Sequence, residues 1–596
     1  MRTQTKLKVQ SVFGSSAGWG RNYTKLVRGR LGNTPGLVQS LAMCVAVLFM
    51  FTSTAHAQQK LSRDLQLASG NVDVIVQFNQ APGKSQLAKV TGRGAAMKRQ
   101  LGLVKGAAFT HLPAAALRDL ANDPDVSYIT PDRPVHGMQD WTEQAVNANM
   151  AWNYGYDGSG VGVAVIDSGI ASVQDLNRMY SSTSRVVYSQ DFTGSSSASD
   201  GYGHGTHVAG IIGGTGQMST GSSYYYTVDG VAPNVSLINL RVLDSNGSGT
   251  DSMVIAAIQR AINLKNNFNI RVINLSLGRQ VYESYTQDPL CQAVEQAWKA
   301  GIVVVVAAGN EGRNNSAGTN GYGTIAAPGN DPYVITVGAM KGMETASRSD
   351  DLITTYSSKG PSAYDHVVKP DIVAPGNYIM SLLAPNSTLV SQYPGNVVGI
   401  SEYKNSNNNF SSSYYFRLSG TSMATPVVSG AAALLIDKDP TLSPDTVKAR
   451  LMKSASKTFP TTSSWTDPST GITYTSQYDI FTIGAGYLDI AAALQNNDVV
   501  LAPLTANSPT ATYNSLTGNV SLVNGTSVIW GSSVVWANSV IWGSSVIWGS
   551  SVIWGSSVIW GSSTSSGFSV IWGSSVIWGS AQDGCEATSI SVNGEM

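Results

Sequence analysis

The chain has 596 residues, with 37 Lys and Arg against 37 Asp and Glu, and a charged fraction of 12%. This length predicts several domains, and the balanced charge gives no indication of a nucleic-acid or anionic-membrane partner. The three cysteines, Cys44, Cys291 and Cys585, are too few for a disulfide scaffold and have no metal-ligand spacing. The sequence leaves open whether Cys291 pairs with Cys585.

The first 57 residues have the order of a secretory signal. No acidic residue occurs in the first 63 positions, where basic residues are followed by an apolar run at 41–51 and by Ala55-His56-Ala57. Basic, apolar and small residues in this order are typical of a signal peptide, and the run is shorter than the ~20 residues of a membrane-spanning helix. We expect residues 1–57 to be removed and the protein to be secreted, hence extracellular.

Residues 71–135 predict a small α+β domain. An alternating strand at 72–78 precedes a helical stretch to about Leu101 and a strand into Phe109. A second helix at Ala114–Ala121 and a last strand at Val126–Ile129 are separated by the turn sequence 122–125. This content predicts a small open sheet with helices on one face.

Residues 140–495 predict an α/β domain with a doubly wound, mostly parallel sheet. Short runs that are apolar on both faces alternate with helical stretches, which is typical of a parallel sheet covered on both sides. The runs are Val161–Ile166, Val235–Leu240, Val272–Leu277, Ile302–Ala308 and Tyr333–Val337, and the helical stretches include Asp251–Asn263 and Pro289–Ala300.

Four motifs of this domain contain the parts that peptide hydrolysis by a serine needs. These parts are a nucleophile, a base, a carboxylate that orients the base, and a donor for the oxyanion. An acid ends the strand of Val163-Ala-Val-Ile-Asp167, and a histidine opens the helix of His204-Gly-Thr-His207. An amide follows the strand in Ala308-Gly-Asn310, and a hydroxyl precedes a helix in Gly420-Thr-Ser422-Met-Ala-Thr-Pro426.

In this chain order the four motifs resemble those of the subtilisin-like serine peptidases, the subtilases. The resemblance implies a serine endopeptidase that works through an acyl-enzyme. It makes Ser422 the nucleophile, His204 the general base and Asp167 the residue that orients the base. It also places the oxyanion between the Asn310 side chain and the Ser422 N–H. The reaction needs no cofactor, and we expect no metal among the catalytic residues.

Each catalytic candidate also has a plainer interpretation. Asp167 fits a turn after its strand, Asn310 and Ser422 fit helix caps, and His204 with His207 fits a pair of metal ligands. No carboxylate or thiol lies at ligand spacing from the two histidines, and the resemblance makes His207 structural. None of these interpretations explains why all four motifs occur together.

The resemblance also implies a substrate site. Ser276, Leu277 and Gly278 would pair with the substrate backbone as an added strand, which implies broad specificity for protein and peptide substrates. Ala326 would lie at the floor of the main specificity pocket and Glu311 at its rim, where an acid tolerates a basic side chain.

The chain departs from the family pattern in two places within this domain. Asp175 matches one ligand of the family's structural calcium site. The loop Gly213–Val228, however, reads Tyr224-Tyr225-Tyr226 where the other ligands would lie, so structural calcium stays open. Residues 377–418 form a long polar insertion before the nucleophile motif, with an Asn-rich surface loop at 405–409.

By the same resemblance, residues 71–135 are an inhibitory propeptide, and the linker 131–140 holds the maturation cut of a self-processing zymogen. Two other classes of protein compete with this interpretation. An intact triad argues against a catalytically silent binding protein that reuses the fold. His204 in its glycine-flanked motif argues against a serine-carboxyl peptidase, whose base is Glu.

Residues 527–580 predict a β-type tail of hexapeptide repeats, Ser-Val-Ile-Trp-Gly-Ser, within a stretch that lacks charge from Val499 to Gln582. Six is an even number, so the tryptophans of an extended chain share one side. We expect the tail to bind a surface, a polysaccharide or itself. A small β-solenoid with the tryptophans as its core is as well supported, and a disordered tail fits the many aromatics less well.

Overall fold

The structure is a computed structural model with two compact units, which divide between Val135 and His136. It describes residues 60–62, 65, 70–131, 141–343, 345–405, 410–468, 470–514, 519–523, 535–536, 541–542, 552–553 and 594–595. The predicted signal peptide, the maturation linker from 132 on, Ser406 with the asparagines at 407–409, Cys585 and most of the repeat tail lie outside the described residues.

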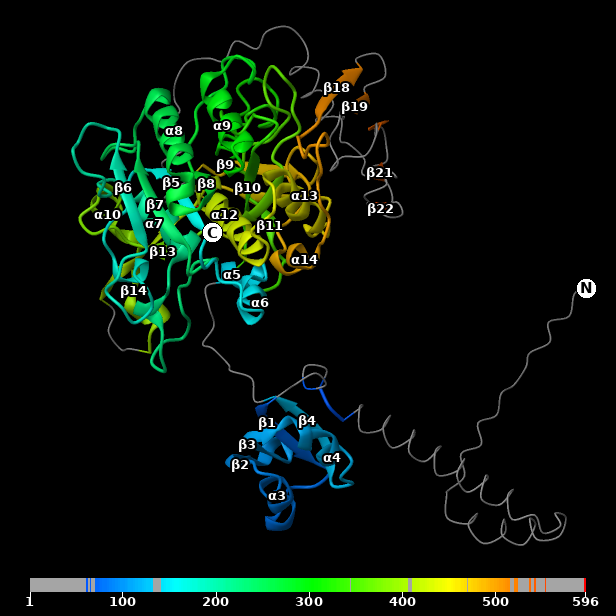
Figure 1. Cartoon of the computed structure of the whole chain (residues 1–596). Coiled ribbons are helices and arrows are strands. Elements are labelled where there is room, and N and C mark those ends of the chain that lie inside the picture. Colours follow the sequence, from blue (N-terminus) through cyan, green and yellow to red (C-terminus); the bar gives the residue numbers. More distant parts are fainter. Residues whose placement is uncertain are drawn as a thin grey trace, which may run out of the picture. The chain divides into compact units, whose positions relative to one another are not determined.

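The smaller unit is a four-stranded antiparallel sheet in the order β2-β3-β1-β4 (Figure 1). Val74, Val76 and Phe78 alternate along β1 and are buried, as expected for a strand with one covered face. Its elements are β1 (Asn71–Phe78), α3 (Lys84–Thr91), β2 (Ala96–Leu101), β3 (Gly106–Pro113), α4 (Leu117–Ala121) and β4 (Val126–Pro131), with 3-10 turns at Gly102–Val104 and Ala114–Ala116.

The predicted helical stretch to about Leu101 is wrong at its second half. Helix α3 ends at Thr91, and Ala96–Leu101 forms strand β2, which pairs with β3. Gly92 caps the helix, and Gly94 has φ +95, a left-handed value that glycine adopts without strain. The sequence Gly-Arg-Gly therefore ends the helix, and β2 forms an edge strand of the sheet.

The larger unit contains an eight-stranded sheet in the order β11-β10-β9-β8-β5-β7-β6, with β12 also on β10. Every pairing is parallel except β10 with β11. The strands are β5 (Gly162–Asp167), β6 (Val186–Asp191), β7 (Ser236–Arg241), β8 (Ile270–Leu275), β9 (Val303–Ala307), β10 (Ile335–Lys341), β11 (Leu352–Ile353) and β12 (Ile372–Pro375). This confirms the predicted mostly parallel α/β sheet.

Helices cover both faces of this sheet (Figure 1). Helices α8 and α9 pack against each other and on strands β8 and β9, while α7 and α12 pack against each other on the opposite face. Strand β5 and strands β8–β10 are almost wholly buried on both faces, which is why their sequences are mostly apolar. The helices are α5 (Trp141–Ala145), α6 (Ala148–Asn153), α7 (His204–Gly213), α8 (Asp251–Phe268), α9 (Pro289–Lys299), α12 (Thr421–Lys438), α13 (Pro444–Ser454) and α14 (Ile490–Gln495), with 3-10 turns at Gln174–Leu176 and Gln217–Ser219.

Residues 377–418, expected as a polar insertion, fold into a separate three-stranded antiparallel sheet. All four residues of β13 are buried, and Tyr415 and Phe416 of β15 are buried against the main core. The elements are β13 (Ile379–Leu382), α10 (Thr388–Gln392), a 3-10 turn at Pro394–Asn396, β14 (Val397–Gly399), α11 (Ile400–Tyr403) and β15 (Ser411–Leu418).

The chain beyond residue 495 continues to pack on the larger unit. Ala506 and Ala511 are fully buried, and Thr510 forms a β-bridge with Val367. The remaining strands are β16 (Thr462–Thr466), β17 (Thr473–Gln477), β18 (Thr510–Asn514), β19 (Asn519–Val523), β20 (Val535–Trp536), β21 (Ile541–Trp542) and β22 (Val552–Ile553). None of the described helices is long and apolar enough to cross a membrane.

Candidate active site

The candidate site lies where the carboxyl ends of parallel strands meet. Strand β5 has β7 on one side and β8 on the other, and the chain order changes direction at this point. A crevice outside the strand ends is expected at such a switch point. Asp167 is the last residue of β5, and the segments after β8 and β9 line a cleft of about 840 Å³.

The structure places His204 beside Asp167. His204 is the first residue of α7, and its Nδ1 lies 2.8 Å from Asp167 Oδ1. Asp167 is fully buried and its Oδ1 also accepts the N–H of Ser168. Burial alone would lower the pKa of His204, but the charge and hydrogen bond of Asp167 outweigh it, so the pKa is raised above 6.5.

Ser422 lies in the first turn of α12 and lines the same cleft as His204. Its hydroxyl donates to the carbonyl oxygen of Ser276 over 3.1 Å. The Ser276 hydroxyl in turn donates to the carbonyl oxygen of Ser422 over 2.8 Å. The nucleophile candidate is thus tied to the segment predicted to bind the substrate backbone.

The side chain of Asn310 is oriented by Thr421. Its Oδ1 accepts the Thr421 N–H over 2.9 Å and the Thr421 hydroxyl over 3.1 Å, which leaves Nδ2 as the donor end on the cleft. Ser422 is the second residue of α12, and N–H groups in a first turn have no acceptor within the helix. Two donors therefore lie close to the candidate nucleophile.

The predicted substrate residues all line this cleft: Ser276, Leu277, Gly278, Glu311 and Ala326. The cleft wall also contains Arg279, which the sequence did not single out. Its guanidinium forms ion pairs with Asp251 at 2.9 Å and Asp288 at 2.8 Å. Arg279 is therefore neutralised by the protein itself, while Glu311 lines the same cleft.

His207 does not share a ligand site with His204. It is fully buried, and its Nε2 lies 3.1 Å from the carbonyl oxygens of both Ile379 and Phe416. Burial and the neighbouring His204 lower its pKa to about 3. The ring ties α7 to the inserted sheet as a neutral group, which removes the basis for a metal pair.

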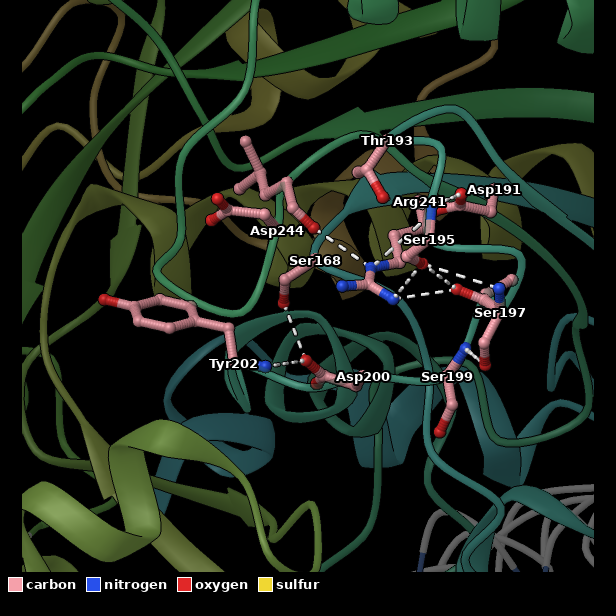
Figure 2. Close-up of polar contacts among 12 residues, drawn as sticks. Ser168, Asp191, Thr193, Ser195, Ser197, Ser199, Asp200, Tyr202, Arg241 and Asp244 are labelled. Atoms are coloured by element: carbon pink, nitrogen blue, oxygen red, sulfur yellow. Dashed lines mark hydrogen bonds and ion pairs between the residues drawn. The ribbon is translucent and has the colours of Figure 1, made fainter.

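Asp200 is a positioning residue that the sequence did not reveal. Figure 2 shows its carboxylate beside Ser168 and the Tyr202 N–H, and it accepts hydrogen bonds from both. It also accepts the N–H of Gly203 and both donors of Thr206. Asp200 thus fixes the loop before His204 and the first turn of α7. An acid four residues before the histidine, at a helix start, was the signal available.

A second cluster in Figure 2 surrounds Arg241 at the end of β7. Its guanidinium donates to the Leu243 carbonyl, the Ser195 hydroxyl and the Ser197 carbonyl, and lies 3.9 Å from Asp191. These contacts hold the loop that leads from β6 to Asp200. The loop before Asp200 is therefore anchored to the end of β7.

The residues around Asp175 do not fit a calcium ion. Its carboxylate accepts the N–H of Met218 over 2.9 Å and the hydroxyl of Tyr415 over 2.8 Å, so both oxygens face donors. In the described ranges no three His, Cys, Asp or Glu residues form a group that would hold a metal.

Cys291 is a buried free thiol that donates to Asn330 Oδ1.

Comparison with known proteins identifies the family that this geometry resembles. The profile of the subtilase family matches residues 158–486. Serine protease AprX of Bacillus subtilis (strain 168) is 36% identical over 353 residues, which cover 58% of this chain and 73% of AprX. Subtilisin E of the same strain is 35% identical over 426 residues, 70% of this chain and 92% of that protein. The alkaline protease of Alkalihalobacillus alcalophilus is 34% identical over 336 residues, 56% of this chain and 70% of that protein.

Proposed function

The chain belongs to the subtilase family and is a serine endopeptidase, and on that premise we propose that Asp167, His204 and Ser422 are its catalytic triad. The observation that carries the proposal is the buried 2.8 Å contact between Asp167 and His204 at the rim of a cleft that Ser422 also lines. A histidine held by a buried carboxylate is suited to take a proton from a neighbouring hydroxyl.

In the proposed reaction, Ser422 Oγ exchanges its bond to Ser276 for one to His204 Nε2, which takes the proton as Oγ attacks the peptide carbonyl. The oxyanion accepts hydrogen bonds from Asn310 Nδ2 and the Ser422 N–H. His204 then protonates the leaving amine as the C–N bond breaks. A water, deprotonated by His204, releases the acyl group from Ser422. All parts come from the chain itself, so the proposed chemistry needs no cofactor.

We propose that the substrate backbone pairs with Ser276, Leu277 and Gly278 as an added strand. These residues follow β8 directly and border the cleft, so their backbone groups are available to an extended peptide. Backbone pairing does not depend on side chains, which supports broad specificity. Ala326 as pocket floor and Glu311 as rim acid are the positions that would modify it.

We propose that the smaller unit at 71–135 is an inhibitory propeptide removed by the enzyme itself. Two observations support this proposal: the unit is compact by itself, and in the sequence it comes after the predicted signal peptide and before the peptidase domain. The basic, apolar and small residues at 1–57 support secretion. The uncharged repeats at 527–580 support association with a surface, a polysaccharide or another copy.

Two measurements test the triad and the zymogen separately. A fluorophosphonate should label Ser422 in the secreted protein and should fail to label His204→Ala, because labelling needs an activated serine. Ser422→Ala, purified from a protease-deficient host, should retain residues 71–135 by mass. A mature-sized Ser422→Ala product would show that another protease removes this unit, whereas failure of labelling would contradict the triad.

A further inference from the structure

Glu595 is a buried acidic residue bound to the larger unit at five points. Its side chain is 2% exposed, and its carboxylate pairs with Arg313 Nη2 at 2.8 Å. The same carboxylate accepts the N–H of Thr355 over 2.8 Å and the Thr355 hydroxyl. The Asn377 amide donates to the Glu595 carbonyl and accepts the Glu595 N–H, both over 2.8 Å. Side chain and backbone of Glu595 are thus recognised separately.

Arg313 is held in place by groups other than Glu595. Its side chain is 7% exposed, and its guanidinium lies over the rings of Trp465 and Tyr474, at 4.6 and 4.9 Å from their centroids. These rings belong to the hairpin β16–β17. Arg313 Nε also donates to the Thr355 hydroxyl, and Asp467 lies 3.9 Å away. Arg313 is thus held by Thr355 and by the β16–β17 hairpin with Asp467, two segments that are distant from it in sequence.

The residue before Glu595 must be glycine in this pose. Gly594 has φ +57, and a Cβ at this position would lie 2.4 Å from Ser419 Oγ and 2.7 Å from the Tyr378 ring. A side chain there would have to displace the Ser419 hydroxyl and the Tyr378 ring, and would adopt a strained left-handed backbone conformation. These contacts therefore favour a Gly-Glu sequence. Arg313 pairs with the glutamate carboxylate, and Ser419 leaves no room for a side chain at the preceding residue.

We propose that Arg313, Thr355, Asn377 and Ser419 form a binding pocket for an acidic Gly-Glu peptide, and that its occupant is the chain's own Gly594–Glu595. We name this group the Arg313 pocket. Arg313 lies three residues after Asn310 and Ser419 three residues before Ser422, so the bound peptide joins the two loops that hold the proposed oxyanion donors. At the other side of the repeats, Thr510 pairs with Val367. Thr510 and Glu595, which lie on either side of the repeats in the sequence, therefore both contact the larger unit.

This inference goes beyond the proposed function and does not depend on it. A buried guanidinium is costly without its carboxylate, because the burial penalty remains when the partner is lost. Emptying the pocket should therefore destabilise the peptidase unit and create a receptor for the same peptide added from outside. Every sample in the three experiments carries Ser422→Ala, so that no peptide is digested and the result is independent of catalysis.

The first experiment compares the melting temperature of two full-length variants. Glu595→Gln should lower Tm by roughly 4 °C or more, because it removes the charge opposite buried Arg313. Glu586→Gln is the matched control, since it removes one carboxylate from the same stretch of sequence and leaves Glu595 in place. Equal Tm values for the two variants would overturn the proposal.

The second experiment titrates a fluorescent peptide of residues 588–596 onto full-length Glu595→Lys. The peptide should bind this variant, whose own segment is repelled by Arg313, and should bind at least about 10-fold more weakly when Gln replaces Glu595 or Ala replaces Gly594. The unsubstituted chain should bind little peptide because its pocket is filled. The proposal would be refuted if the three peptides bound Glu595→Lys equally well. It would also be refuted if the peptide of residues 588–596 bound equally well to Glu595→Lys and to the unsubstituted chain.

Size-exclusion chromatography separates an occupant in the same chain from one in a second copy. The full-length chain and Glu595→Lys should elute alike across protein concentration. A larger species that is lost on Glu595→Lys would contradict the intramolecular assignment. If Glu595→Lys fails to fold, the Tm comparison of Glu595→Gln with Glu586→Gln decides the question.

Discussion

At the scale of single residues, the candidate site depends on the orientation of its polar side chains as well as on which residues are present. Motifs identify Asp167, His204, Asn310 and Ser422, because each lies in a short local pattern at a strand end or helix start. The sequence does not show that Thr421 orients the Asn310 amide, or that Ser429 and Asn274 form a hydrogen-bonded chain to Ser276. Most of those contacts join residues more than a hundred positions apart.

Removing the oriented amide should affect the transition state alone. Asn310→Ala should lower kcat by ~10²–10³ with little change in KM, because Nδ2 gains its strong bond only when charge develops on the substrate oxygen. Steady-state kinetics on a small peptide substrate measures both constants. Asn314→Ala, in the same cleft wall, should change neither. A raised KM with unchanged kcat would assign Asn310 to ground-state binding.

In the proposed mechanism, the raised pKa of His204 would set the acid limit of activity. The base must be neutral, so activity should fall as pH drops through a value above 6.5. In Asp167→Asn, burial still lowers the pKa of His204, but the charge that raised it is gone. The pH at which activity falls on the acid side should therefore be lower than in the unsubstituted chain, and kcat should fall by ~10⁴. The pH dependence of kcat/KM tests this. As a control, Asp244→Asn should leave the pH of this acid-side fall unchanged. The same pH in Asp167→Asn would contradict the proposed effect of Asp167 on the pKa of His204.

At the scale of secondary-structure elements, burial decides what a sequence reveals. Strands β5, β8 and β9 were predictable because both faces are buried and are occupied mostly by apolar residues. The inserted sheet was missed because β15 begins with three serines, of which Ser412 is buried, and has buried Tyr415 and Phe416 only after them, so its composition is largely polar. The end of α3 was missed because a helical pattern extends past Gly92 and Gly94, whose backbone geometry ends the helix.

Asp200 should act through the position of α7. It is buried, burial raises its pKa, and it bonds the donors on both sides of His204. Asp200→Asn should lower kcat by roughly 10²-fold, with KM nearly unchanged, because the imidazole loses its fixed position. Fluorophosphonate labelling should slow in parallel, which a general loss of stability would not cause in folded protein.

The matched control for Asp200 is Asp191→Asn. Asp191 bonds Thr193 and Ser195 in the same group of loops but contacts no residue of α7 in the described contacts (Figure 2). Its substitution should leave kcat within about twofold, because its hydrogen bonds stay within its own loop. Equal losses in the two variants would mean that the whole loop, rather than Asp200, positions His204.

At the scale of the whole molecule, the sequence indicates the succession of regions along the chain but not the contacts between residues that are far apart in it. The signal-like start, the small α+β unit, the peptidase unit and the repeats differ in composition, so each is visible in the sequence. Ser508 bonds buried Lys448 and Asp371, although it follows the expected end of the peptidase domain at 495. Neither this contact nor the return of Glu595 leaves a local pattern, because each depends on the completed fold.

Truncation at two positions should separate the repeat tail from the peptidase. A chain ending at Val523 keeps Ser508, buried Ala511 and the hairpin β18–β19, so it should cleave a small peptide substrate at nearly the full rate. It should melt at a lower temperature, since the Arg313 pocket is emptied. A chain ending at Leu504 loses Ser508, whose partner Lys448 has its pKa lowered by burial to about 7, and it should lose both stability and activity.

The chain ending at Val523 should also lose association. Tryptophans at 530, 536, 542, 548, 554, 560, 572 and 578 are six or twelve residues apart, which places them on one side of an extended chain. An uncharged strand with such a side has no charge to prevent pairing at its edges. Sedimentation with insoluble polysaccharide and size-exclusion chromatography compare the two chains. Unchanged binding and oligomeric state after truncation at Val523 would contradict a role for the repeats in association, because the peptidase unit alone would then account for both.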